Sequence, residues 1–225
     1  MSNSLIRAIL NTSKEEVYGL PDGRQGEDYM EIKTMIQSTP NPNALKFVLN
    51  VPVKNQGKVT YKNAGQCGHN PMAAALFTVP NITEVYFFDN YVTVTQDGNV
   101  DWDQIEEQIK KLILEYAADH DPDFLVEEDK KTALVVSDDP EIVKINAILD
   151  NTIRPGLQMD GGDLHVVSFD GINLTVSYQG ACGSCPSSTM GTLKAIESIL
   201  RDQYNPEITV VTEGSAQEHE HGTAY

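Results

Sequence analysis

Apolar positions recur along the chain in two separate blocks, each mixing the period of a strand with the period of a helix. The elements predicted in the first block are strands over 30–36 and 45–49, a short helix over 71–77, strands over 82–88 and 91–95, and a helix from Asp101. Asp89-Asn90 is typical of a tight hairpin turn. The last helix carries an apolar stripe formed by Trp102, Ile105, Ile109, Leu112 and Tyr116. We expect a first α+β unit over residues 29–118.

A proline-rich segment, Thr39-Pro40-Asn41-Pro42-Asn43, separates the first two predicted strands. It can form neither a regular helix nor a central strand, because proline lacks an amide hydrogen and restricts the preceding residue. Two interpretations stay open at this point: a rigid turn that sets the strand order, or a surface that recognises a partner.

The second block predicts the order α-β-β-α-β over residues 139–213. Its elements are a helix that begins after Asp139 and is closed by Pro155, strands over 164–169 and 172–178 around the hairpin turn Asp170-Gly171, a helix stopped by Asn205-Pro206, and a strand over 208–211. The predicted fold class is therefore α+β, with two small α/β-sandwich-type domains.

The remaining segments carry little periodicity. We expect residues 1–28 to be an N-terminal extension with one short helix near 5–10, residues 119–138 to be an acidic linker, and residues 214–225 to be a polar, disordered tail.

Charge and hydropathy narrow the range of partners. The 225 residues carry a formal net charge of −17, which disfavours binding to nucleic acid and to anionic membranes. No apolar run is long enough to span a bilayer, so we expect no membrane partner. Glu15 and Glu16 follow the first apolar residues, which is atypical of an acid-poor transit peptide. These features predict a cytoplasmic protein.

The strongest chemical feature is the loop Gly180-Ala181-Cys182-Gly183-Ser184-Cys185-Pro186-Ser187-Ser188, which lies between a predicted strand and a helix. Its small residues indicate an exposed loop. Two thiolates are half of the ligands that an iron–sulfur cluster or a tetrahedral zinc site needs. Zinc shared by two chains therefore stays open. So does dithiol redox chemistry, although Ala181 and the proline after the second cysteine are atypical of a thioredoxin-like centre. Inert buried thiols are the weakest alternative.

Other candidates have simpler explanations. Cys67 with His69 resembles an incomplete metal site but is better read as a loop cysteine near a helix start, and His165 as a hydrogen-bonded strand residue. Asp160 and Asp163 flank two glycines and indicate a turn. His219 and His221 lie in the solvated tail.

The combination of Met159-Asp160-Gly161-Gly162-Asp163 with Cys182-Gly183-Ser184-Cys185-Pro186-Ser187-Ser188 resembles the C-terminal domain of NifU, the Nfu family. Independently, Thr39–Phe47, the hairpin from Phe87-Phe88 to Val92–Val94, and Asp101-Trp102 resemble the N-terminal domain of many Nfu proteins. The resemblance covers residues 30–212, and it leaves residues 1–28, the tail and Gln66–His69 unmatched.

The resemblance implies an iron–sulfur cluster scaffold or carrier that is not an enzyme. It implies a [4Fe–4S] cluster, with [2Fe–2S] as the other form, held by Cys182 and Cys185 of two subunits in a homodimer that forms on cluster binding. The implied protein partners are apo iron–sulfur proteins and an upstream cluster-assembly scaffold. The helix that starts at Pro186 directs its positive N-terminal end at this loop, which favours thiolates and an anionic cluster.

Overall fold

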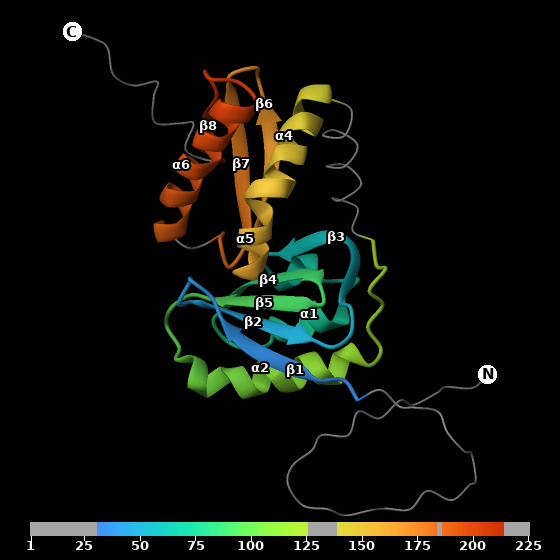
Figure 1. Ribbon diagram of the computed structural model, residues 1–225. Helices are drawn as coiled ribbons and strands as arrows, with labels where there is room; N and C mark the ends of the chain where they lie inside the picture. Colours follow the sequence, from blue (N-terminus) through green and yellow to red (C-terminus); the bar gives the residue numbers. More distant parts are fainter. Residues whose placement is uncertain (1–30, 126–138, 184–185, 214–225) are drawn as a thin grey trace, which may run out of the picture.

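The computed structural model describes residues 31–125, 139–183 and 186–213 (Figure 1). The elements of its N-terminal half are β1 (Thr34–Ser38), β2 (Ala44–Leu49), β3 (Lys54–Tyr61), α1 (Pro71–Leu76), β4 (Ile82–Asp89), β5 (Tyr91–Gln96) and α2 (Trp102–Ala117). Those of its C-terminal half are α4 (Pro140–Thr152), α5 (Arg154–Met159), β6 (Gly162–Phe169), β7 (Asn173–Gly180), α6 (Pro186–Gln203) and β8 (Thr209–Thr212).

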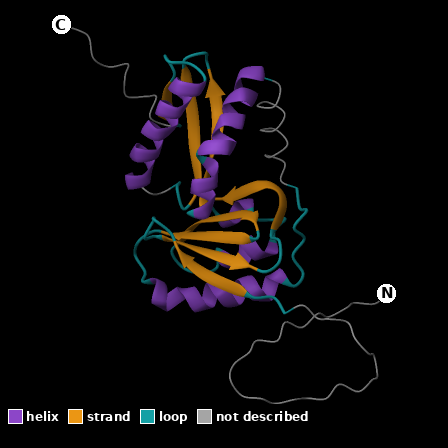
Figure 2. Ribbon diagram, viewed as in Figure 1, coloured by secondary structure: helices purple, strands orange, loops and turns teal. Residues whose placement is uncertain are grey.

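The N-terminal unit is a five-stranded antiparallel sheet in the order β1-β2-β5-β4-β3, with α1 and α2 on one face (Figures 1 and 2). Alternate strand residues such as Phe47, Val85 and Val94 point into the core on this helix-covered face, where they meet Ile109 and Ile113 of α2. The period of two along a strand and the period of 3.6 along a helix together produce this core.

The C-terminal unit has a sheet in the order β6-β7-β8. β6 and β7 form a hairpin, and β8 pairs with β7 in parallel after the chain returns through α6. Ile145 of α4 and Ile196 of α6 are fully buried against Leu164 and Val176 of the sheet. The turn of the hairpin is closed by Asp170, whose carboxylate accepts hydrogen bonds from two following backbone amides.

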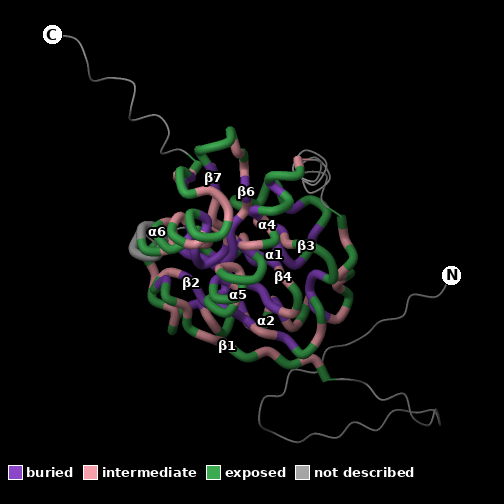
Figure 3. The backbone as a smooth tube through the Cα atoms, turned by 45° about the horizontal axis from the view of Figure 1, so that its top comes forward, coloured by how far each residue is buried: buried purple, intermediate pink, exposed green. Residues whose placement is uncertain are grey.

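The two units pack directly on each other. The end of the C-terminal unit that carries α5 and the last residues of β7 rests on the sheet face opposite α1 and α2, so that the sheet lies between helices below and the C-terminal unit above (Figure 1). Figure 3 colours the chain by burial, and buried residues occur both in the sheet and in the C-terminal unit.

This architecture confirms the α+β class. The sequence prediction did not include β3 or α5. β3 begins with a polar run, and α5 is a separate turn of helix with Pro155 in its first turn, so α4 ends at Thr152. Residues 119–125, assigned to the start of the linker, are bound to the N-terminal unit: the Asn55 amide donates to the Pro122 carbonyl.

The expectations for residues 1–28, for 126–138 and for the tail lie outside the described residues, and the domain boundaries stay a prediction. Within the described part of the chain, no helix has the length and apolar character needed to cross a membrane.

Candidate functional site

The cysteine loop begins where β7 ends and leads into α6. Gly180 turns the chain with a φ of +61°, a conformation that favours glycine. The Ala181 amide then donates to the Gly161 carbonyl at 3.1 Å, and the Gly183 amide to the Gly180 carbonyl at 2.9 Å. The structure thus places the loop at the strand–helix junction predicted for it. Cys185 lies outside the described residues.

Cys182 is only 5% exposed, so the expectation of an open loop is wrong for this residue. Its side chain packs into the core of the C-terminal unit. A Cβ atom added at Gly162 would lie 2.5 Å from the Cys182 Sγ, which shows how closely the backbone of β6 approaches the thiol. The Asp-Gly-Gly-Asp turn and the cysteine loop therefore form one structural site, because Gly162 pairs with Gly180, which follows it by 18 positions.

Three tyrosines surround this site. Tyr178 comes from β7, whereas Tyr86 and Tyr91 come from the N-terminal sheet. Burial raises the pKa of all three phenols, and each lies near enough to Cys182 for an ionised thiol there to raise it further. The surroundings of Cys182 are therefore built by both units.

Asp163 is the second carboxylate of the predicted turn, and it is buried with a side chain 2% exposed. It forms an ion pair with Lys58 of β3 at 2.8 Å and lies 3.6 Å from the Arg154 guanidinium. Gln158 and the amide of Leu164 donate hydrogen bonds to it. Asp160, at the other end of the turn, is exposed. The turn prediction holds, and the buried Asp163 links the two units.

The N-terminal sheet presents a second set of alternate residues, which point away from its own core and toward the C-terminal unit. We call this set the polar face: Lys46, Lys58, Glu84, Tyr86, Tyr91 and Thr93. The Lys46 ammonium donates to the carbonyls of Gln158 and Met159 at the end of α5. The Lys58 ammonium donates to the Leu164 carbonyl at 2.7 Å. The sequence analysis did not predict a role for these residues. Their only sequence signal is that polar residues alternate with apolar ones along the strands.

Two further residues of the polar face contact the Asp-Gly-Gly-Asp turn and the cysteine loop. The Thr93 hydroxyl donates to the Gly161 carbonyl at 2.7 Å. Glu84 accepts a hydrogen bond from the Gly180 amide, and its burial raises the pKa of this carboxyl to about 7. The polar face therefore contacts the residues on both sides of the Cys182 thiol.

The proline-rich segment contributes one more contact. Asn41 is 3% exposed, and its side-chain amide donates to the carbonyl of Ala181, the residue before Cys182, at 2.9 Å. Its side-chain oxygen accepts from the Asn43 amide, which fixes the turn. The segment is thus both a rigid turn and a contact to the cysteine loop.

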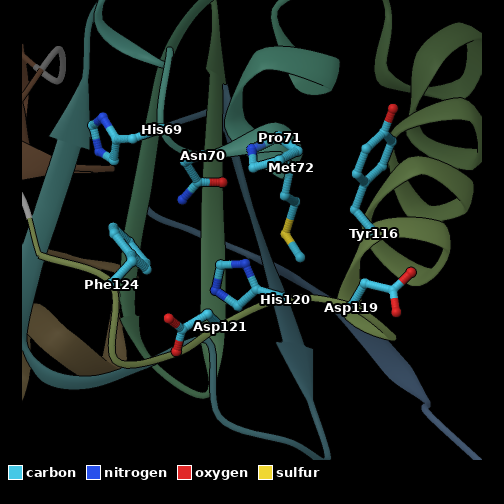
Figure 4. A pocket seen from close by; sticks show the side chains of 9 residues that line it. All are labelled: His69, Asn70, Pro71, Met72, Tyr116, Asp119, His120, Asp121 and Phe124. Atoms are coloured by element: carbon cyan, nitrogen blue, oxygen red, sulfur yellow. The ribbon is translucent and has the colours of Figure 1, made fainter. Parts of the chain in front are cut away.

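Cys67 and His69 lie elsewhere, at the start of α1. The Cys67 thiol donates to the Asn63 carbonyl at 3.4 Å, and burial raises the pKa of the thiol to about 11. The His69 ring is 2.9 Å from the Tyr61 hydroxyl. A cavity of about 190 Å³ beside His69 is lined by residues of α1, the end of α2 and Phe124, and it does not include Cys67 (Figure 4).

His165 of β6 is half-buried, and burial together with the charges of Lys58 and Arg154 lowers its pKa. His219 and His221 lie outside the described residues. Among the residues that the structure describes, no group of three or more histidine, cysteine or acidic side chains is arranged to hold a metal ion.

Comparison with known proteins gives matches in both halves of the chain. The family model described as "Scaffold protein Nfu/NifU N terminal" matches residues 32–120, and the one described as "NifU-like domain" matches residues 145–211. "NifU-like protein 4, mitochondrial" of Arabidopsis thaliana is 33% identical over 193 residues, which are 83% of this chain and 68% of that protein. The human "NFU1 iron-sulfur cluster scaffold homolog, mitochondrial" is 33% identical over 181 residues, 80% of this chain and 70% of the relative.

Among solved structures, a NifU-like protein from Saccharomyces cerevisiae is similar to 45% of this chain and 89% of its own, at 24% identity and a TM-score of 0.36.

These names correct the predicted localisation. The Arabidopsis, human and Drosophila relatives are all named as mitochondrial, which contradicts the cytoplasmic prediction. That prediction depended on Glu15 and Glu16 near the start of the sequence, and two acidic residues are too weak a signal to decide the compartment. With 33% identity over 68% and 70% of two relatives and both family models matched in order, the chain belongs to the Nfu family of NifU-like proteins.

Proposed function

We propose that this protein is an iron–sulfur cluster scaffold or carrier, that its cargo binds to Cys182 and Cys185, and that it works in mitochondria. The observation that carries the proposal is the position of the cysteine loop between the end of β7 and the start of α6. The curated relatives named as iron–sulfur cluster scaffolds support the assignment of the cargo. Their names likewise support the mitochondrial location.

Two cysteines supply half of the thiolates that a [4Fe–4S] cluster takes. The remaining two come from the same loop of a second chain, so that the cluster joins a homodimer. α6 runs from Pro186 to Gln203, and its N-terminal end follows Cys185 directly. The partial positive charge at that end favours both the thiolates and the anionic cluster.

A cluster held at the seam of two chains is suited to transfer. The cysteines of an apo-acceptor replace the scaffold thiolates one after another, and the cluster leaves without net oxidation or reduction. An upstream scaffold supplies the cluster, apo iron–sulfur proteins receive it, and the protein turns over no substrate of its own.

Anaerobic reconstitution with iron and sulfide tests this function directly. A bridging [4Fe–4S] cluster corresponds to about two iron and two sulfide ions per chain in a dimer. We expect the cluster-free chain to be a monomer and loading to produce the dimer. An absence of iron uptake, with a Cys182–Cys185 disulfide that cycles readily or with bound zinc, would favour dithiol redox chemistry or a structural metal instead.

Cysteine variants locate the cluster. We expect Cys182→Ser and Cys185→Ser to lose stable cluster binding and to keep the fold. Cys67→Ala is the matched control, because this thiol is buried and hydrogen-bonded within the N-terminal unit. A Cys185→Ser chain that still holds a full cluster would show that the ligand assignment is wrong.

A further inference from the structure

The polar face packs against the C-terminal unit and is largely shielded from solvent. Strand register places Lys46, Thr93, Tyr86 and Thr60 side by side across β2, β5, β4 and β3. Thr93 and Tyr86 are fully buried, and Lys46 is 8% exposed. A sheet face whose polar side chains are buried needs partners for them. Lys46, Lys58 and Thr93 find such partners in backbone carbonyls of α5, of β6 and of the Asp-Gly-Gly-Asp turn, respectively.

Glycines on the C-terminal side of this contact are matched to the polar face. A Cβ atom at Gly180 would lie 2.9 Å from the Tyr86 ring, and one at Gly161 would lie 3.1 Å from the Thr93 hydroxyl and 3.3 Å from the Lys46 Cβ. Any larger residue at these positions would push the two units apart. The small residues of the cysteine loop were expected to leave it exposed, whereas the chain's own N-terminal sheet packs against Gly180.

The closed arrangement and a shared cluster exclude each other. A ligand sulfur must approach its metal to about 2.3 Å, and a cluster between two chains requires both cysteines of each loop to face the other chain. Cys182 is 5% exposed, and Ala181 before it is 2% exposed and held by Asn41. The N-terminal unit covers Gly180 and Ala181, which precede this thiol, so a second chain cannot reach the start of the loop until the polar face and Asn41 have moved away.

We propose that the polar face and Asn41 form a clasp that binds Gly180 and Ala181, the start of the cysteine loop of the same chain, in the cluster-free state and is released when a second chain joins it around a cluster. The release of the clasp rests on the proposed function, whereas the closed contact rests on the structure alone.

Amine labelling of the full-length chain measures the clasp without iron. Lys46 and Lys58 donate to the C-terminal unit when the clasp is closed, whereas the Lys33 side chain is 69% exposed and serves as the internal reference. In the cluster-free wild type we expect an acetylating reagent to modify Lys46 and Lys58 at least ~10-fold more slowly than Lys33, because only the open form reacts. Loading with iron and sulfide should remove this protection.

The variant Thr93→Lys opens the clasp by placing a long charged side chain where the Gly161 carbonyl lies, and it leaves the core of the N-terminal unit untouched because Thr93 points away from that core. Met35→Lys on β1 is the matched control, since Met35 is 58% exposed. We expect fast labelling of Lys46 and Lys58 and faster cluster uptake in Thr93→Lys, and wild-type behaviour in Met35→Lys.

The outcomes separate the clasp from the function. Equal labelling of Lys46, Lys58 and Lys33 in the cluster-free wild type would overturn the clasp. A dimeric, iron-loaded wild type in which Lys46 and Lys58 stay protected would also overturn it, and the proposed function would stand. If no iron is bound under any condition, the proposed function fails, whereas protection in the wild type and its loss in Thr93→Lys still support the closed contact.

Discussion

Replacing Asp163 with asparagine removes the charge at the centre of the contact between the units and keeps the shape of the side chain. The carboxylate faces Lys58 at 2.8 Å and Arg154 at 3.6 Å, and it is 2% exposed. Breaking a buried ion pair by removing one partner costs ~3–5 kcal/mol. Lys58 keeps 20% of its side chain exposed and Arg154 retains Asp150, so both cations are partly compensated and we expect a loss near ~3 kcal/mol.

Urea unfolding at pH 7 measures this loss, with far-UV circular dichroism following both units. The single tryptophan, Trp102, lies in the N-terminal unit, where its indole N–H donates to the Pro42 carbonyl, so fluorescence follows that unit alone. With a slope of about 1 kcal/mol/M, Asp163→Asn should lower the circular dichroism midpoint by ~3 M and the fluorescence midpoint by much less.

Asp160→Asn is the control, because Asp160 is exposed in the same turn and its replacement should change the free energy of unfolding by less than ~0.5 kcal/mol. If Asp163→Asn behaved like Asp160→Asn, the buried ion pair would contribute nothing, and the assignment of Asp163 as the link between the units would be refuted.

Burial raises the pKa of Glu84 from 4.5 to about 7, so the folded chain binds more protons than the unfolded chain between these pH values. The free energy of unfolding should therefore fall by up to ~3 kcal/mol as the pH rises through this window. Urea midpoints of the Glu84→Gln variant should not show this dependence on pH. Gly162→Ala should destabilise the C-terminal unit by ~1–3 kcal/mol in thermal unfolding, because the new Cβ would collide with the Cys182 Sγ. Gly156→Ala, which meets nothing within 4 Å, should leave the melting temperature unchanged or raise it slightly. Asn41→Ala leaves a buried carbonyl without its donor, which costs ~1–3 kcal/mol and should speed amine labelling of the clasp lysines by ~10-fold; unchanged labelling would show that this hydrogen bond does not hold the clasp.

Much of the fold was predictable because local patterns decide it. The apolar stripe of α2 predicted a helix that packs by one side, and Ile105 and Ile109 are buried as that pattern requires. Asp170-Gly171 predicted the hairpin of β6 and β7, and the carboxylate of Asp170 closes that turn. These patterns involve only a few neighbouring residues, so they can be recognised in the sequence without knowledge of the tertiary structure.

β3 was not predictable because its polar residues find their partners far along the chain. The Lys54 ammonium donates to the Phe124 carbonyl, and Lys58 pairs with Asp163. In the sequence, such a lysine-rich run is typical of a loop. Burial of Cys182 was missed because the small residues around it indicate an exposed loop, whereas its side chain packs into the core of the C-terminal unit.

The covalent connection between the units gives the clasp an advantage that no second chain shares. A binding face joined to its target within one chain acts at an effective concentration on the order of millimolar. A second chain at micromolar concentration therefore competes at a disadvantage of about a thousandfold, or roughly 4 kcal/mol. Chain concentration alone should not produce the dimer, and the iron–thiolate bonds must supply this difference, so that subunit association reports the presence of cargo.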